Sequence, residues 1–260
     1  MKVGDEKEIY FQRFLDHLSR LILQDLELAR KNRGTEQRFA PYNRMLCWKM
    51  GDKDVKIFYV PFDDLRKDAQ IVIVGLTPGY SSMFLSYSAS LLLIENGCPK
   101  NLIARKAKNF SVFTEERREL ARMLDGIGIP RALGLRKSIE LLQDKQNLLH
   151  STFATHYAAF KHSVNYVGIS PDFISSMFFK NILERYLINE LNTIKDALVV
   201  PLGSRVSEIL LHLIRSTGTL VHEQCLLGFP NPAPCNPLRH SEYEERRFAL
   251  QNKVAKWFRR

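Results

Sequence analysis

The feature that most constrains the fold is a continuous apolar run that ends in a loop of glycine and proline. Residues 69–75 read Ala-Gln-Ile-Val-Ile-Val-Gly, and residues 76–82 follow as Leu-Thr-Pro-Gly-Tyr-Ser-Ser. A β-branched run without alternation is typical of a strand buried on both faces, as in a parallel sheet with helices on each side. We therefore expect such a strand here, with a tight turn at its carboxyl end.

Other segments extend this pattern along the chain. Further strands are predicted at residues 55–60, 147–155, 197–203 and 219–227. Helices are predicted at residues 5–32, 115–125, 137–146 and 206–214, and Ser241-Glu242-Tyr243-Glu244 has the form of a capping box that opens a last helix. Because strands alternate with helices, the expected fold class is α/β: a single three-layer α/β/α domain with a central, largely parallel sheet. We expect residues 1–68 to form an N-terminal helical extension packed on a domain over residues 69–260.

The charge is the most informative part of the composition. The 260 residues include 38 Lys and Arg against 28 Asp and Glu, which gives a net charge of +10. Residues 100–137 contribute +6 of this excess and residues 239–260 contribute +4. A basic surface favours a polyanionic partner such as DNA, but two solvated helical faces explain the same numbers.

The cysteines and the hydropathy exclude several other classes of protein. Cys47, Cys98, Cys225 and Cys235 form no close C-x-x-C pair, so we expect reduced thiols and neither a metal nor an iron–sulfur cluster. No stretch approaches the roughly 20 apolar residues of a membrane-spanning helix, and the first residues have no apolar signal core. The expectation is a cytoplasmic monomer with no membrane partner.

Two loops stand where ligands bind in parallel sheets, beyond the carboxyl ends of the strands. The first is Gly75–Ser82, and the second, at residues 228–236, reads Gly-Phe-Pro-Asn-Pro-Ala-Pro-Cys-Asn. The prolines restrict the backbone of the second loop. Each loop by itself is also explained as an ordinary turn or a rigid loop tip, so only their order and their strand context point to function.

In that order and context the loops resemble the motifs of the uracil-DNA glycosylase superfamily. In those enzymes a Gly-x-Asp/Asn/Ala-Pro-Gly motif after a strand holds the hydrolytic water, and a His/Asn-Pro-Ser-x motif approaches the base and the minor groove. Residues 75–82 are most similar to the mismatch-specific and thymine-glycosylase branch, Gly-x-Asn-Pro-Gly-x-Ser-Ser, and Pro-Leu-Gly-Ser at 201–204 is similar to the family's strand-to-helix turn near a phosphate. The resemblance lies in these loops and in the strand order over about residues 69–258, and most of residues 83–146 contain no motif of the family. It implies a uracil-DNA glycosylase-like fold, double-stranded DNA as the partner, and no cofactor.

The resemblance also implies roles for individual residues. Thr77 would position the water, and Asn231 would donate a hydrogen bond to the leaving base as it becomes anionic. The implied base-binding residues are Gly75, Leu76, Pro78, Gly79, Tyr80, Phe84, Tyr87 and His156. The implied DNA-binding residues are Ser81, Ser82, Lys161 and Ser204, with Pro232, Ala233, Pro234, Cys235 and Asn236 as the minor-groove wedge.

Thr77 departs from the family motif. A neutral hydroxyl orients water but is not a strong general base, so a carboxylate such as Asp172, or a histidine, is a candidate for the missing function. Neither loop contains a lysine. Water rather than an amine is therefore expected to attack the sugar, which leaves an intact abasic site.

Three functions stay open on the sequence: a monofunctional DNA glycosylase, a catalytically silent binder of modified DNA, and an unrelated α/β enzyme that uses its proline-glycine loop for a nucleotide. The chain length, the absence of iron–sulfur cysteines and the unusual first motif resemble Brig-type anti-phage DNA glycosylases, which excise glucosylated hydroxymethylcytosine. For a glycosylase we therefore expect a flipped modified pyrimidine, in antiviral defence, ahead of uracil or mismatched thymine in base excision repair.

Overall fold

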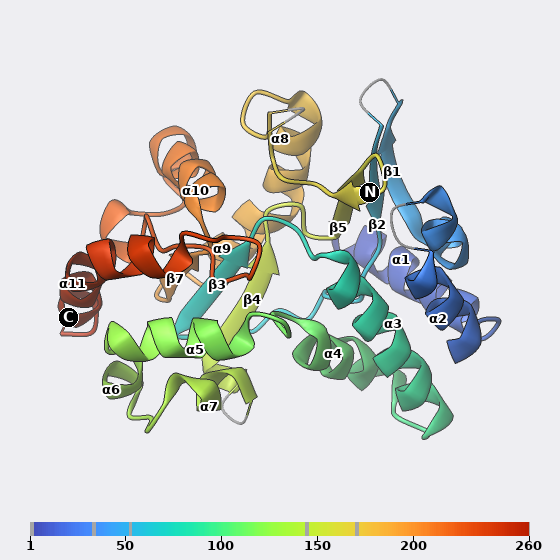
Figure 1. Cartoon of the computed structure of the whole chain (residues 1–260), viewed down its shortest axis with the longest axis horizontal. Helices are drawn as coiled ribbons and strands as arrows, with labels where there is room; N and C mark the ends of the chain where they lie inside the picture. The colour runs from blue at the N-terminus through green and yellow to red at the C-terminus, as the bar shows by residue number, and fades with distance from the viewer. Residues whose placement is uncertain (1–2, 33–34, 52–53, 144–145, 170–171, 260) are drawn as a thin grey trace. The chain divides into compact units, whose positions relative to one another are not determined.

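The computed structural model (Figure 1) describes residues 3–32, 35–51, 54–143, 146–169 and 172–259. The chain divides into two compact units whose segments alternate along the sequence. Unit 1 comprises Met1–Asp64, Thr77–Val112 and Thr155–Tyr186, and unit 2 comprises Leu65–Leu76, Phe113–Ala154 and Leu187–Arg260. The division into an extension over residues 1–68 and a domain over 69–260 stays a prediction.

Unit 2 contains a parallel three-stranded sheet. β3 (Ile71–Gly75) lies between β4 (Leu149–Phe153) and β7 (Leu198–Pro201) and pairs in parallel with both. Every residue of β3 and β7 is buried, which explains why these strands consist of apolar runs without alternation. The mixed α/β class and the strands predicted within residues 69–75, 147–155 and 197–203 are confirmed.

Helices flank this sheet. They are α5 (Arg117–Gly126), α6 (Ile129–Leu133), α7 (Ser138–Gln143), α9 (Asn189–Thr193), α10 (Ser204–Thr217) and α11 (Arg239–Trp257). In Figure 1, α10 lies on one side of the three strands and α5 to α7 lie on the other. The helices predicted at 115–125 and 206–214 are confirmed as α5 and α10, and α7 lies within the predicted 137–146, of which residues 144–145 are outside the described residues.

Two local predictions in unit 2 are wrong. Residues 219–227 do not form a fourth strand: they contain the short 3₁₀ helix η5 (His222–Gln224) and a single parallel bridge between Val199 and Cys225. Gln224 Nε2 donates to the main-chain oxygens of Lys195 and Ala197, both at 2.8 Å. A side chain thus supplies hydrogen bonds that the main chain of a neighbouring strand would otherwise make. Nor does Ser241 cap α11, which begins at Arg239 after Leu238.

Unit 1 contains an antiparallel sheet in the order β1-β2-β5-β6. Its strands are β1 (Leu46–Met50), β2 (Val55–Phe58), β5 (Ala158–Lys161) and β6 (Val164–Asn165). The strand predicted at 55–60 is confirmed as β2. The single central sheet expected from the sequence is corrected to two separate sheets, because the pairing of β2 with β5 joins distant segments that no local pattern specifies.

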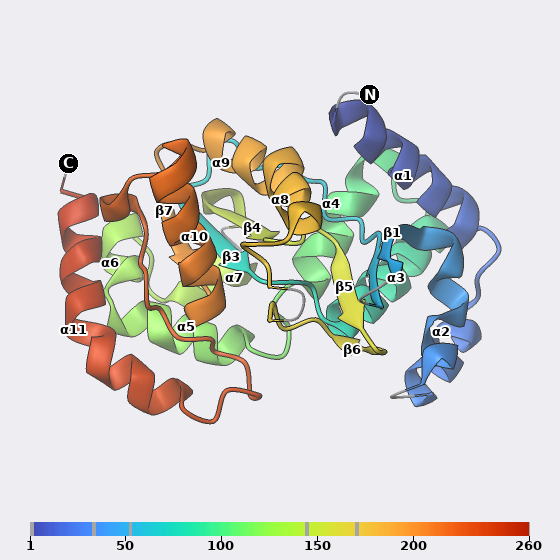
Figure 2. The same cartoon turned by 90° about the horizontal axis from the view of Figure 1, so that it is seen from above.

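The helices of unit 1 pack on an aromatic core. They are α1 (Val3–Leu18), α2 (Leu23–Lys31), the 3₁₀ segment η1 (Glu36–Met45), α3 (Tyr80–Glu95), α4 (Lys100–Ser111) and α8 (Met177–Leu183), with a short π-helical turn after α8. The single helix predicted over residues 5–32 is wrong, since Figure 2 shows α1 and α2 as separate helices. Ile22 has an extended backbone, and its N–H donates to Asp25 Oδ2 at 3.2 Å, which starts the second helix.

Candidate functional site

Within unit 1, the hydroxyl of Thr77 binds the backbone of β5. Ala159 N–H donates to Thr77 Oγ1 at 2.8 Å, and the hydroxyl lies within hydrogen-bonding distance of the carbonyl oxygens of Pro78 (3.2 Å) and Tyr157 (3.5 Å). Thr77 is half-buried. Its oxygen already accepts a main-chain hydrogen bond, so less of its hydrogen-bonding capacity is left for a water.

The residues after Thr77 are fixed by β6 and by η1. Gly79 precedes α3 and supplies no capping side chain, and Asn165 Oδ1 accepts the N–H of Tyr80 at 3.1 Å in its place. A Cβ built on Gly79 would lie 3.0 Å from Asn165 Nδ2, so a side chain here would press on the amide that accepts the Tyr80 N–H. The guanidinium of Arg38 lies 3.5 Å from the centre of the Tyr80 ring and covers one of its faces.

The other aromatic candidates of unit 1 lie at different depths. Tyr87 is fully buried, donates to Tyr59 O at 3.2 Å and packs edge-on against Phe14. Phe84 is half-buried beneath Arg30, 5.6 Å from its ring centre. Tyr80 is also buried, at 7% exposure, so a base could stack on Tyr80 or Tyr87 only if the core opened, whereas Phe84 is half-buried.

His156 belongs to a buried acid–aromatic cluster that sequence reasoning missed. Its Nε2 shares a hydrogen bond of 3.0 Å with Asp63 Oδ1, which also accepts from Tyr157 OH at 2.9 Å, while Asp63 Oδ2 accepts from Tyr59 OH at 2.8 Å. His156 is 2% exposed and has a φ of 61°, and Tyr186 stacks on its ring at 4.2 Å. A left-handed backbone is uncommon at a residue other than glycine, and these contacts stabilise it at His156.

A second carboxylate extends this cluster. Glu6 is 5% exposed and accepts hydrogen bonds from Tyr10 OH (3.3 Å), Tyr186 OH (3.1 Å) and Arg185 NH1 (2.7 Å). Burial raises the pKa values of Tyr10 and Tyr186 above the ordinary range. The four tyrosines and two carboxylates are scattered over the sequence, and no motif marks them as a group.

In unit 2, Gly75 is the last residue of β3 and packs against the ring of Phe153 in β4. A Cβ on Gly75 would lie 2.6 Å from the Phe153 ring, and Ala154 N–H donates to Gly75 O at 2.9 Å. Leu76 follows and is half-buried. The first glycine of the motif is therefore required by packing within the sheet, whether or not it also approaches a base.

Asn231 presents an oriented amide donor. Its Oδ1 accepts the N–H of Ala233 at 3.1 Å, which fixes which end of the amide is the oxygen. In the described part of the chain the NH₂ group of Asn231 donates to no other residue, and the side chain is half-buried. The Asn231 NH₂ group is therefore an oriented donor that makes no hydrogen bond to the described residues.

The strand-to-helix turn at 201–204 lies against Asn231. Gly203 N–H donates to Phe229 O at 3.0 Å, and a Cβ on Gly203 would lie 3.1 Å from Asn231 Cβ. Ser204 is the exposed first residue of α10. The structure thus brings together two of the predicted segments, the Gly203–Ser204 turn and the Asn231 loop, beside the carboxyl end of β7.

Asn236 organises the rest of the second loop. Its Nδ2 donates to Asn231 O at 3.2 Å and to Glu242 Oε2 at 3.0 Å, and its Oδ1 accepts the N–H of Leu238 at 3.1 Å. Arg239 NH1 donates to Asn236 O at 2.9 Å. The Asn236 amide, predicted as a DNA contact, is therefore engaged at both of its ends by groups of this protein.

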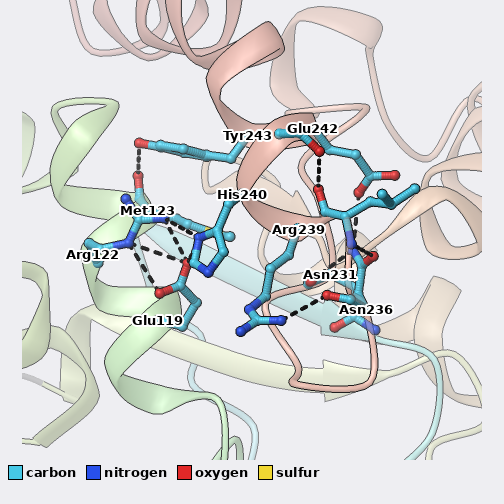
Figure 3. Close-up of polar contacts among 11 residues, drawn as sticks. Glu119, Arg122, Met123, Asn231, Asn236, Arg239, His240, Glu242 and Tyr243 are labelled. Carbon is cyan, nitrogen blue, oxygen red and sulfur yellow. Dashed lines mark hydrogen bonds and ion pairs between the residues drawn. The ribbon is translucent and has the colours of Figure 1, made fainter.

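The first turn of α11 also contacts α5. Figure 3 shows Arg239 and Glu242 facing the Asn231 loop, whereas His240 and Tyr243 face α5. Tyr243 OH donates to Met123 O at 2.7 Å, and Glu119 lies 2.7 Å from Arg122 NH2 and 3.3 Å from His240 Nδ1. The hydrogen bond from Arg122 lowers the pKa of Glu119. Parts of the two basic segments of the sequence therefore meet at this turn.

The remaining candidates are distributed over both units. In unit 1, Ser81 is exposed, Ser82 and Lys161 are half-buried, and Asp172 Oδ1 accepts from the N–H and Oγ of Ser175, both at 2.9 Å. In unit 2, Pro232 is buried, Ala233 is half-buried, and Pro234 and Cys235 are exposed at the loop tip. Asp172 thus shapes a turn, and its part in catalysis stays a prediction.

Among the described residues, no helix is long and apolar enough to cross a membrane, and no group of three or more His, Cys, Asp or Glu could hold a metal ion. All four cysteines are free.

The chain is similar to a distantly related protein. The chain is 29% identical over 206 residues to the uncharacterized protein YoxB of Bacillus subtilis (strain 168), an alignment that covers 78% of this chain and 80% of that protein. No family model matches the chain, and no solved structure matches it. The similarity to YoxB extends over most of both chains and assigns no activity.

Proposed function

We propose that this protein is a monofunctional DNA glycosylase with a uracil-DNA glycosylase-like fold. It hydrolyses the N-glycosidic bond of a flipped, modified pyrimidine in duplex DNA and leaves an abasic site. Glucosylated hydroxymethylcytosine of phage DNA is the preferred candidate substrate, ahead of uracil and mismatched thymine. In this proposal the enzyme is cytoplasmic, binds duplex DNA as a monomer and uses no cofactor.

The Asn231 amide is the observation that carries this proposal. Cleavage of an N-glycosidic bond develops negative charge on the departing base, and a fixed donor aimed at that charge lowers the barrier. Ala233 N–H holds Asn231 Oδ1, so the unused NH₂ group keeps one direction. A donor that does not need to reorient during the reaction is what such a transition state requires.

The distribution of charge supports DNA as the partner. Arg118, Arg131 and Arg136 are exposed on α5, α6 and the segment that follows, and Lys256 is exposed on α11. Because a duplex is a polyanion, exposed cations in the unit that carries Asn231 would attract and orient it. Ser204, at the start of α10, could bind a phosphate beside the same loop.

The test is base release from defined duplexes by the wild-type protein and by Asn231→Ala. Substrates carrying glucosylated hydroxymethylcytosine, uracil or a mismatched thymine are incubated without metal or cofactor, and alkali-labile sites are measured. We expect Asn231→Ala to lower excision by roughly 10²-fold or more with duplex affinity kept. The matched control is Asn252→Ala, an exposed asparagine of α11. Full activity in Asn231→Ala would rule out this amide as the leaving-base donor.

One observation favours a second candidate, a catalytically silent binder of modified DNA. Thr77 Oγ1 is held by Ala159 N–H at 2.8 Å, and the first loop, residues 75–82, contains no carboxylate. A site without a general base activates water poorly. Duplex affinity without release of any of the three bases would favour this candidate, and absence of affinity would overturn both.

A further inference from the structure

Three cations of α11 are spaced seven residues apart and contact the Asn231 loop or the segment just before it. Arg239 NH1 donates to Asn236 O at 2.9 Å, Arg246 NH1 to Gly228 O at 3.0 Å, and Lys253 Nζ to Cys225 O at 2.7 Å. Seven residues make about two helical turns, so these side chains lie along one stripe of the helix. Each ends on a main-chain carbonyl of residues 225–236.

In the sequence, these carbonyl groups lie on both sides of Asn231. Cys225 and Gly228 precede it in the chain, and Asn236 follows it. Gly228 has a φ of 84°, and a Cβ built there would lie 3.6 Å from Arg246 Cδ. The Arg246 side chain therefore packs along the turn that leads into the loop as well as bonding its oxygen.

The three cations differ from their neighbours on the same helix. Arg239, Arg246 and Lys253 are half-buried, whereas Arg247 and Lys256 are exposed. Burial also lowers the pKa of Lys253, which agrees with an ammonium withdrawn from solvent. If Arg246 or Lys253 turned outward to a phosphate, Gly228 O or Cys225 O would lose the side-chain donor that binds it here. Asn236 O would still accept the main-chain N–H of Arg239 at 3.4 Å.

We infer that Arg239, Arg246 and Lys253 are positioning residues, which fix the loop so that the Asn231 amide keeps its direction, and that they are not phosphate contacts. The inference rests on the proposed function for its catalytic consequence, while the loop contacts themselves do not depend on it. Part of the basic excess of the terminal segment therefore serves the geometry of the site.

The kinetic test separates positioning from phosphate binding. Arg246→Gln should lower the single-turnover excision rate by about tenfold or more, because a small misplacement of a reacting group is costly. The slope of log K for duplex binding against log salt should stay unchanged, whereas loss of one phosphate contact would change it by about 0.9. Arg246→Lys, which retains a donor, should recover part of the rate. The matched control is Arg247→Gln, whose exposed guanidinium pairs with Glu244 at 3.3 Å.

Amide hydrogen exchange of residues 226–238 provides a readout independent of activity. We expect faster exchange in Arg246→Gln and in Lys253→Met, and wild-type exchange in Arg247→Gln. If Arg246→Gln fails to fold, Arg239→Gln at the other end of the loop replaces it. Unchanged exchange in folded Arg246→Gln and Lys253→Met, or a reduced salt slope with an unchanged rate, would overturn the inference. If the wild-type protein excises no base but the two variants still exchange faster, the positioning role stands and the proposed glycosylase activity is rejected.

Discussion

Gly203 packs directly against Asn231: a Cβ built on Gly203 would lie 3.1 Å from the Cβ of Asn231. Gly203 also has a φ of 96°, a conformation that residues with a side chain rarely adopt. The strand-to-helix turn and the second loop are thus in contact through a glycine, and this contact sets where the Asn231 backbone lies.

Gly203→Ala should therefore be destabilising for two reasons, backbone strain and displacement of Asn231. We expect a loss of about 1–3 kcal/mol in the free energy of unfolding, measured by urea denaturation. Gly218→Ala is the matched control, because Gly218 also has a positive φ, 66°, but a Cβ there meets nothing within 4 Å. Equal losses in the two variants would show that the contact with Asn231 contributes nothing.

Gly126 and Tyr243 should show strong non-additivity. A Cβ on Gly126 would lie 2.1 Å from Tyr243 OH but 3.3 Å from Tyr243 Cζ. Gly126→Ala must displace the hydroxyl from Met123 O, while Tyr243→Phe loses only that hydrogen bond, about 1 kcal/mol. The double variant should be more stable than Gly126→Ala, since the hydroxyl that the added methyl group would meet is gone. Additive changes in a denaturation cycle would contradict this packing.

Thr77→Val should destabilise unit 1 by about 1–3 kcal/mol, because Ala159 N–H loses its acceptor. Thr77→Ser retains the hydroxyl, so its loss should be smaller. Thermal unfolding measures both. Excision assayed well below the unfolding temperature then tests the second role: if Thr77 also orients water, Val lowers the rate and Ser does not.

The protein should lose stability in alkali as its tyrosines ionise. Burial raises the pKa values of Tyr59, Tyr87 and Tyr157 well above that of a tyrosine in an unfolded chain. With a folded pKa above the unfolded value, each contributes stability that is complete below about pH 10 and is lost as the pH rises further. Unfolding and tyrosinate absorbance should therefore rise together. Ionisation of all nine tyrosines in a protein that stays folded would contradict the raised pKa values of Tyr59, Tyr87 and Tyr157.

The net charge shows what the sequence predicts about a partner and what it does not. Its excess pointed to a polyanionic partner, and its two source segments were visible in the sequence. The sequence does not show which of these cations are free to bind such a partner, because a count of lysines and arginines does not show which groups their side chains hydrogen-bond. Arg246 ends on Gly228 O and Lys253 on Cys225 O, so both are engaged inside the protein. The seven-residue spacing of Arg239, Arg246 and Lys253 was the available signal.

The sequence by itself determined the parallel strands β3, β4 and β7, the helices α5 and α10, and the two loops that carry Thr77 and Asn231. These depend on local pattern: apolar runs without alternation, helical periodicity, and glycine and proline at the ends of elements. Only the tertiary structure decided that the strands form two sheets, that Asp63 gathers Tyr59, Tyr157 and His156, and that α11 holds the Asn231 loop. Those features join segments far apart in the chain, and local patterns do not specify which distant hydrogen-bonding groups will pair.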